Sequence, residues 1–123
     1  MEELIANARG LVGEFRLSSE WTMAGAVGSA LLTRRGNIYT GINVDLLCGI
    51  GFCAEHAAVA SMLEKRETRI EMIVAVSDKG IVPPCGRCRE MLIQVNAGNA
   101  DTKVVLGAQE WVGLSALLPR HWL

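Results

Sequence analysis

The chain has 123 residues, of which half are hydrophobic, 12 are basic and 13 are acidic, so its formal net charge is −1. This length suits one domain over residues 1–123, and the balanced charge lacks the basic excess with which proteins hold nucleic acids. No apolar run approaches the roughly 20 residues of a membrane span, and the Met1-Glu2-Glu3 start is acidic where a secretory signal is basic. We therefore expect a cytoplasmic protein with reduced cysteines and with neither nucleic acid nor membrane as a partner. The mean hydropathy of +0.28 favours a homo-oligomer.

The first half of the chain predicts one helix and two strands. Apolar residues at helical spacing predict an amphipathic helix over 3–17. The runs 26–32 and 38–44 predict strands, joined by the hairpin-type link Arg34-Arg35-Gly36-Asn37. Residues 46–52, which include two glycines, predict a loop.

The second half alternates helices and strands. Residues 54–66 predict a helix, and the apolar stretch 57–63 predicts that this helix is buried on every side. The run 70–76 predicts a buried strand, and Pro83-Pro84 interrupts the chain after it. Further elements are predicted as a helix over 86–96 ended by Gly98, a strand over 103–106, a fifth strand near 111–112 and a helical turn over 115–118. This order predicts an α/β sandwich with a mixed five-stranded sheet.

Two short motifs at predicted helix starts carry the chemistry. Cys53-Ala54-Glu55 comes first, and Pro84-Cys85-Gly86-Arg87-Cys88 follows later in the chain. A Cys-x-x-Cys pair and a third thiolate from a neighbouring helix start converge on Zn²⁺ and leave one tetrahedral position open, as in catalytic zinc sites. Helix N-termini and hydrogen bonds to the sulfurs from Arg87, Arg89 and His56 would offset the negative charge of three thiolates.

Glu55 has the position expected of a general acid and base. It lies two residues after Cys53 on the first predicted helical turn, so that its carboxylate can face the open position without binding the metal. We expect Glu55 to take a proton from water and to pass it to a substrate nitrogen. A ligand, a glutamate two positions on and a later Pro-Cys-x-x-Cys form the signature of zinc-dependent nucleobase deaminases.

These motifs make the chain similar to the cytidine deaminase family, in particular to its small all-cysteine branch, which includes the blasticidin S deaminases. Thr40-Gly41-Ile42-Asn43-Val44 resembles the strand before the catalytic loop, and Leu117-Leu118-Pro119 with Trp122 resembles the family's closing segment. The resemblance implies a homotetramer of three-layer α/β/α subunits, with one Zn²⁺ per subunit and sites near the subunit interfaces. It also implies hydrolytic removal of the 4-amino group of a cytosine nucleoside.

By position, the resemblance implies a role for each motif residue. Zinc would be held by Cys53, Cys85 and Cys88, and Glu55 would be the catalytic proton carrier. Substrate contacts are implied at Asn43, Asp45, Ala54, Ser29 and Trp122, and support of the sulfurs at Arg87 and His56. Asn43 would hold a ribose hydroxyl, and Trp122 would stand against the base, often in a neighbouring subunit's site.

Departures from the family pattern bear on the substrate. Asp45 stands where cytidine-type members have glutamate and blasticidin S-type members have an aromatic residue, so it favours a free ribose. Gly25 replaces a phenylalanine, and His56 replaces the arginine that follows the catalytic glutamate. Ser29 and residues 84–90 look more like the blasticidin S branch.

Several alternatives stay open on sequence grounds. The substrate is a cytosine nucleoside, with blasticidin S or another 4-aminopyrimidine as the alternative. A different class of function is a structural zinc site with Cys48 as fourth thiolate, or a nucleoside-binding module without catalysis. Apart from this, Cys48 is interpreted as a loop residue without a role. Lys79 is interpreted as a solvated lysine, although it lies near a basic position of the blasticidin S branch.

Overall fold

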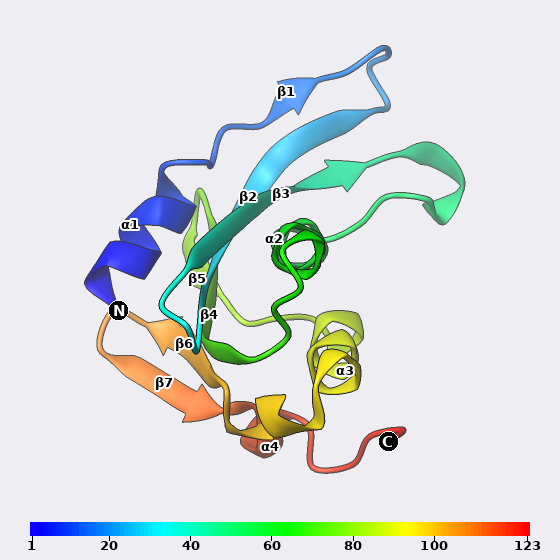
Figure 1. Ribbon diagram of the computed structural model, residues 1–123. Coiled ribbons are helices and arrows are strands. Elements are labelled where there is room, and N and C mark those ends of the chain that lie inside the picture. Colours follow the sequence, from blue (N-terminus) through cyan, green and yellow to red (C-terminus); the bar gives the residue numbers. More distant parts are fainter.

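The computed structural model describes residues 1–123 as one mixed sheet of seven strands with helices on both faces (Figure 1). The strands are β1 Phe15–Arg16, β2 Met23–Thr33, β3 Ile38–Asp45, β4 Ile70–Ser77, β5 Gly80–Val82, β6 Lys103–Gly107 and β7 Glu110–Gly113. The α-helices are α1 Glu2–Arg9, α2 Ala54–Glu64, α3 Gly86–Val95 and α4 Leu114–Leu117, and the 3₁₀ helices are η1 Leu47–Gly49 and η2 Ala97–Asp101. The predicted mixed sheet is confirmed, whereas the predicted count of five strands was wrong.

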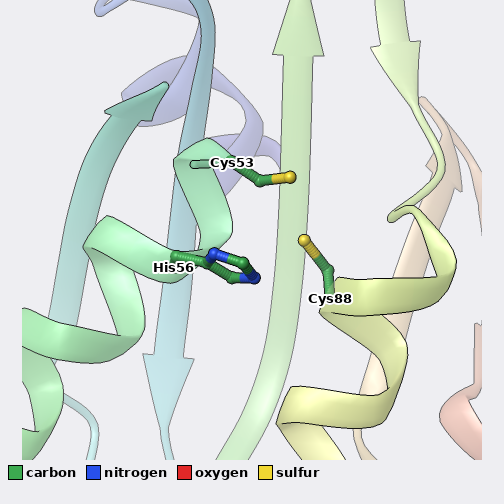
Figure 2. Close-up of side chains that lie close together, drawn as sticks. All are labelled: Cys53, His56 and Cys88. Carbon is green, nitrogen blue, oxygen red and sulfur yellow. The ribbon is translucent and has the colours of Figure 1, made fainter. Parts of the chain in front are cut away.

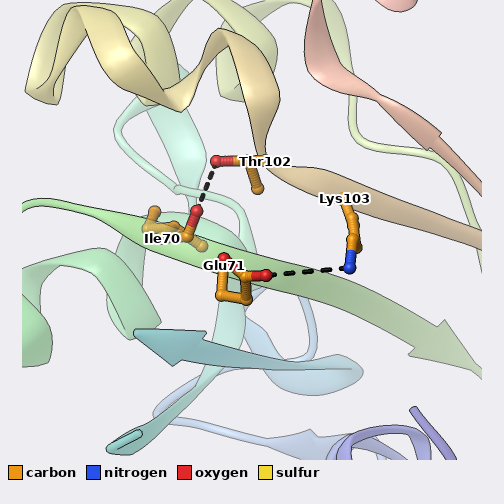
Figure 3. Close-up of polar contacts among 4 residues, drawn as sticks. All are labelled: Ile70, Glu71, Thr102 and Lys103. Atoms are coloured by element: carbon orange, nitrogen blue, oxygen red, sulfur yellow. Dashed lines mark hydrogen bonds and ion pairs between the residues drawn. The ribbon is translucent and has the colours of Figure 1, made fainter. Parts of the chain in front are cut away.

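The sheet contains one parallel pair, β4 with β6, and its other pairs are antiparallel. Parallel neighbours need a crossover connection, and α3 lies in the segment that connects β4 to β6. The starts of the two strands are aligned by side chains (Figure 3). The Thr102 hydroxyl donates to the Ile70 carbonyl at 2.8 Å, and the Lys103 ammonium lies 3.7 Å from the Glu71 carboxylate.

Adjacent residues on β2, β4 and β6 face opposite sides of the sheet, because side chains alternate along a strand. On each of these three strands, one residue of a neighbouring pair packs against α1. These residues are Ala30, Val74 and Val105. The next or preceding residue packs against α2 and α3 on the other face, and these are Leu31, Ile73 and Val104. Figure 1 shows the same arrangement, with α1 on one side of the sheet and α2 and α3 on the other. The expected three layers are therefore confirmed.

The helix predicted over 3–17 is wrong beyond Arg9. Gly10 ends α1, in keeping with the poor helix propensity of glycine, and the chain then turns back toward β2. The Gly13 N–H donates to the Gly25 carbonyl at 2.9 Å, and β1 pairs with the start of β2. Gly25 has a φ of +86°, and the Phe15 ring lies 3.3 Å from where a Cβ on Gly25 would be. A glycine is required there by both backbone and space.

The sequence predicted that the helix over 54–66 is buried on every side. This prediction is wrong, because helix α2 is exposed on part of its surface. Ala58, Val59 and Met62 are buried, but Ala60 and Leu63 are exposed. The reason is that the sheet covers one side of α2 and α3 covers only part of the rest. None of the helices has the combination of length and apolar composition needed to cross a membrane.

Candidate metal centre and active site

Three thiols meet where the N-termini of α2 and α3 come together. Cys53 is the N-cap residue of α2, Cys85 is the N-cap residue of α3, and Cys88 lies on the first turn of α3. The sulfur of Cys85 lies 3.6 Å from those of both Cys53 and Cys88. Figure 2 shows Cys53 and Cys88 directed toward each other from the two helices, with the His56 ring beside them. All four cysteines of the chain are free thiols.

The spacing of the sulfurs fits zinc. Zinc–sulfur bonds of about 2.3 Å in tetrahedral geometry place two sulfurs roughly 3.8 Å apart, and the observed separations are 3.6 Å. The ligand atoms of Cys53, Cys88 and His56 also lie within 4.8 Å of one another. The donors are thus thiols and an imidazole, which are the groups that zinc prefers over carboxylates alone.

The thiols are electrostatically unequal. Burial raises the pKa of Cys53 and of Cys88 above the ordinary value of 9.0. Burial acts in the same direction on Cys85, but its hydrogen bonds with the backbone and the thiol of Cys88 outweigh this effect, and the pKa of Cys85 is lowered. Cys85 is therefore the thiol most ready to ionise, and a cation bound between the three would favour the thiolate form of all of them.

The N-terminal half of α2 is held in place by a close approach to β3. A Cβ on Gly41 would lie 2.5 Å from the Ala57 Cβ and 2.5 Å from the Ala58 nitrogen. Such distances leave no room for any side chain at this position of β3. The helix that carries Cys53 and Glu55 can therefore lie directly on the sheet.

Glu55 lines a cavity of about 420 Å³ that Cys53, Cys85 and Arg87 also line. Its side chain is only 5% exposed. Burial raises the pKa of Glu55 above 4.5, although a backbone and a thiol hydrogen bond oppose the shift. A carboxyl group whose pKa is shifted toward neutral pH is suited to accept and return a proton.

Asn43 and Asp45, at the end of β3, also line this cavity. The Asn43 side-chain oxygen accepts a hydrogen bond from the Val27 N–H at 2.8 Å, where the pairing of β2 and β3 is irregular between Ala24 and Gly28. The Asn43 amide donates to the Asp45 carboxylate at 3.4 Å. Asn43 is thus largely used within the protein, whereas the Asp45 side chain is exposed at the cavity.

His56 has one ring nitrogen, Nε2, that is buried and has no hydrogen-bond partner. Burial, followed by the charge of Arg87, lowers the pKa of His56. The ring is therefore neutral at pH 7, with one N–H and one lone pair. The ring lies beside the sulfurs of Cys53 and Cys88.

Comparison with known proteins decides the family. Residues 11–107 match the model of the "cytidine and deoxycytidylate deaminase zinc-binding region". The chain belongs to this family. It is therefore a zinc-dependent deaminase, and the expectations of an enzyme and of a zinc cofactor are confirmed.

Relatives and solved structures of the deaminase family agree with this assignment. A cytidine deaminase from Halalkalibacterium halodurans is 37% identical over 100 residues, which cover 76% of this chain and 74% of that protein. The crystal structure of cytidine deaminase from Mycobacterium tuberculosis superposes with a TM-score of 0.81 at 27% identity, covering 98% of this chain and 94% of that one. The cytidine deaminase structure from Burkholderia pseudomallei has a TM-score of 0.76 at 29% identity, covering 98% and 97%.

Two residues expected to contact substrate lie away from the deaminase cavity. Ser29 is fully buried within the sheet, and its hydroxyl donates to the Val74 carbonyl at 2.9 Å. Trp122 is 89% exposed near the C-terminus and does not line the cavity of its own chain. Ala54, by contrast, lines the cavity together with Glu55.

Two further residues also differ from their expected surroundings. Arg89 does not support a sulfur, because its guanidinium donates to the carbonyls of Pro84 and Leu117 at 2.8 and 3.1 Å. Cys48 is exposed on η1, with a φ of 61°, and is not among the converging ligand atoms. The sulfur contacts join Cys53, Cys85 and Cys88, and none brings Cys48 to them as a fourth thiolate.

The sequence did not identify several apolar residues that line the deaminase cavity. These are Val27, Leu46, Phe52, Val82 and Pro83. Phe52 and Pro83 directly precede the two cysteine motifs in the chain. This adjacency is the feature of the sequence that could have predicted their place in the cavity. Val27 faces the cavity at the irregular pairing of β2 with β3, which no local pattern predicts.

Proposed function

We propose that this deaminase converts a free cytosine nucleoside, of the cytidine or deoxycytidine type, to the uracil nucleoside and ammonia. The observation that carries this proposal is that Glu55, Cys53 and Cys85 share one cavity with the exposed Asp45 carboxylate, and that the Cys88 sulfur lies 3.6 Å from that of Cys85. The relatives reported above are cytidine deaminases, which favours a cytosine nucleoside over blasticidin S as the substrate.

The proposed metal ligands are Cys53, Cys85 and Cys88. When bound, zinc would act as a Lewis acid that makes water a nucleophile at neutral pH. The proposed role of Arg87 and His56 is to lower the negative charge that the sulfurs would otherwise present to the attacking water. Arg87 lines the cavity with Cys85, and His56 lies next to the sulfurs of Cys53 and Cys88.

Glu55 moves both protons of the attacking water in this proposal. The water oxygen forms a bond to C4 of the ring, and Glu55 takes one proton and delivers it to N3. Glu55 then carries the second proton to the 4-amino group, which leaves as ammonia when the C4–N bond breaks. The buried position of Glu55 suits these transfers, because a raised pKa lowers the cost of holding the proton in between.

Asp45 is the proposed ribose-binding group, and Asn43 positions it. The Asp45 carboxylate can accept hydrogen bonds from sugar hydroxyls, and the Asn43 amide orients it from 3.4 Å. Because the Asn43 oxygen is occupied by the Val27 N–H, its contribution to sugar binding would come from the amide donors alone.

The test is a substrate panel on zinc-loaded protein. Cytidine, deoxycytidine and blasticidin S are each incubated with the enzyme, and deamination is followed by ultraviolet absorbance. We expect turnover of cytidine or deoxycytidine. Protein that contains zinc and is folded, but that deaminates neither nucleoside, would contradict the proposal.

We further propose that residues 1–123 act as one domain in a homotetramer. Apolar side chains near the cavity are exposed in the single chain, among them Leu47 and Ile50, the latter at 68%. Exposed apolar side chains of this kind mark protein interfaces, and Trp122 would reach the site of a neighbouring subunit. Light scattering at micromolar concentration should give four chains per particle, whereas a stable monomer would refute the tetramer.

A further inference from the structure

A second cavity, of about 210 Å³, lies where the turn between β2 and β3 meets the connection from α2 to β4. It has no hydrophobic lining and is formed by Arg34, Arg35, Arg66, Glu67, Thr68 and Arg69. Arg66, in the lining of this cavity, lies two residues after the last residue of α2, whereas Cys53 caps the N-terminus of the same helix. Eleven helical residues span about 16 Å, so this arginine cavity is separate from the deaminase site.

The arginine cavity holds more positive charge than its one carboxylate can neutralise. Four guanidinium groups face one carboxylate there, an excess of three positive charges in a chain whose net charge is −1. The one ion pair of the structure joins Lys103 to Glu71, so none of the four arginines is paired with a carboxylate. Like charges held together without a counter-charge repel, and a bound anion would relieve this repulsion.

The two segments around this cavity are joined to each other by Glu67. A single oxygen of the Glu67 carboxylate accepts hydrogen bonds from the Tyr39 hydroxyl at 2.6 Å and the Asn37 amide at 2.8 Å. The Arg34 N–H also donates to the Arg69 carbonyl at 3.1 Å. Glu67 is thus used to hold the turn against the connection, and the arginine cavity is a built feature rather than a chance meeting of two loops.

Two of the arginines are themselves held. Arg69 packs against Gly98, and its guanidinium donates to the Gly98 carbonyl and, at 3.3 Å, to the Asn99 side chain. Arg66 has a φ of +63°, a left-handed conformation that favours glycine, and donates to the Leu63 carbonyl at 3.3 Å. Arg66 directly follows Lys65, the C-cap residue of α2, and a left-handed residue at this point commonly ends a helix, so the position of Arg66 is fixed by the helix end.

We propose that the arginine cavity binds a small phosphate-bearing anion. Arginine forks match the geometry of phosphate oxygens and bind them through paired, charge-assisted hydrogen bonds. The cavity is smaller than the roughly 300–1,000 Å³ typical of sites for whole organic ligands, so it would enclose phosphate groups and leave any attached organic part outside. The guanidiniums of Arg34 and Arg35 are exposed, make no hydrogen bond within the chain and are free to bind the anion.

The test is calorimetric titration of the zinc-loaded protein with inorganic pyrophosphate at low ionic strength. The double variant Arg34→Gln/Arg35→Gln removes two guanidiniums that form no side-chain hydrogen bond, so the fold should be kept. The matched control, Arg9→Gln/Arg120→Gln, removes the same charge from exposed positions outside the cavity. Zinc content is measured after each titration, because pyrophosphate also binds free zinc.

We expect saturable binding to one site per chain, weakened about tenfold or more in the cavity variant and nearly unchanged in the control. Binding should persist with the deaminase cavity saturated by nucleoside. Parallel titrations with inorganic phosphate and with ATP show whether the cavity binds a free phosphate or the phosphate groups of a nucleotide more tightly. No saturable binding at millimolar pyrophosphate, an equal loss in the control variant, or binding of oligonucleotides alone would overturn the proposal.

Discussion

The sulfur of Cys53 lies 3.6 Å from the sulfur of Cys85, although 32 positions separate the two residues in the chain. Each residue is the N-cap of a helix, and the two helices lie on the same face of the sheet. The contact therefore exists only when α2 and α3 have both docked. Binding of zinc and correct packing of the two helices should depend on each other for this reason.

Removal of the Glu55 carboxylate should abolish deamination without loss of the metal. In Glu55→Gln the side chain keeps its size but no longer accepts a proton, so turnover of cytidine should fall by at least about 10²- to 10⁴-fold. Zinc content and thermal unfolding should stay close to those of the parent protein. Glu64→Gln, at the exposed end of the same helix, is the matched control and should retain full turnover. Near-normal activity of Glu55→Gln would exclude Glu55 as the proton carrier.

The cysteines should separate into three that hold zinc and one that does not. Cys53→Ser and Cys88→Ser each remove one sulfur of the cluster, and we expect zinc to be lost on dialysis against a mild chelator. Cys48→Ser should keep one zinc per chain, because Cys48 is exposed on η1. Elemental analysis of the dialysed proteins gives the metal content directly. Loss of zinc from Cys48→Ser would instead indicate a fourth thiolate.

The Glu67 carboxylate should make the free energy of unfolding depend on pH. Hydrogen bonds, first from Tyr39 and then from Thr33 and Asn37, hold the pKa of Glu67 below its ordinary value of 4.5. A carboxyl group with a lowered pKa in the folded state stabilises the fold above pH 4.5 and loses this effect as the pH falls through the lower value.

Urea unfolding as a function of pH tests this contribution. The parent protein should lose stability as the pH falls below 4.5, and Glu67→Gln should be less stable at neutral pH with a shallower loss in acid. The exposed Glu64→Gln serves as control and should follow the parent curve. If Glu67→Gln shows the same acid dependence as the parent, these hydrogen bonds do not favour the ionised form.

A methyl group at Gly41 should disturb the contact between β3 and α2. A Cβ there would overlap Ala57 and the backbone of Ala58, so we expect Gly41→Ala to destabilise the fold by about 1–3 kcal/mol and to lower zinc affinity. Gly13→Ala, where a Cβ would meet nothing within 4 Å, should change stability by less than about 0.5 kcal/mol. Equal unfolding midpoints for the two variants would show that the helix can shift away from the strand.

The convergence of the three thiols was predictable from sequence because it depends on residues at two helix starts. Cys85 and Cys88 are three residues apart on one helix, and Glu55 follows Cys53 at a spacing that allows few arrangements. The residues Ser29 and Trp122 were chosen by resemblance to a family, and the geometry of a single chain does not place them in the cavity.

The errors in the predicted fold arose where a distant partner determines the structure. Phe15 and Arg16 have the spacing of a helix, yet they form a strand because β2 offers unpaired backbone groups beside them. Strand β5 has only three residues and exists through its pairing with β4. The exposure of Leu63 depends on how far α3 extends along α2, which no periodicity in α2 encodes.

The alternation of side chains on β2, β4 and β6 restricts how the gene for this protein can change in length. Deletion of one codon within any of these strands would exchange residues such as Leu31 and Ala30 between the two layers, and large side chains would meet spaces shaped for small ones. Insertions and deletions should therefore accumulate in the turns, and the central strands should keep a constant length among descendants of this sequence.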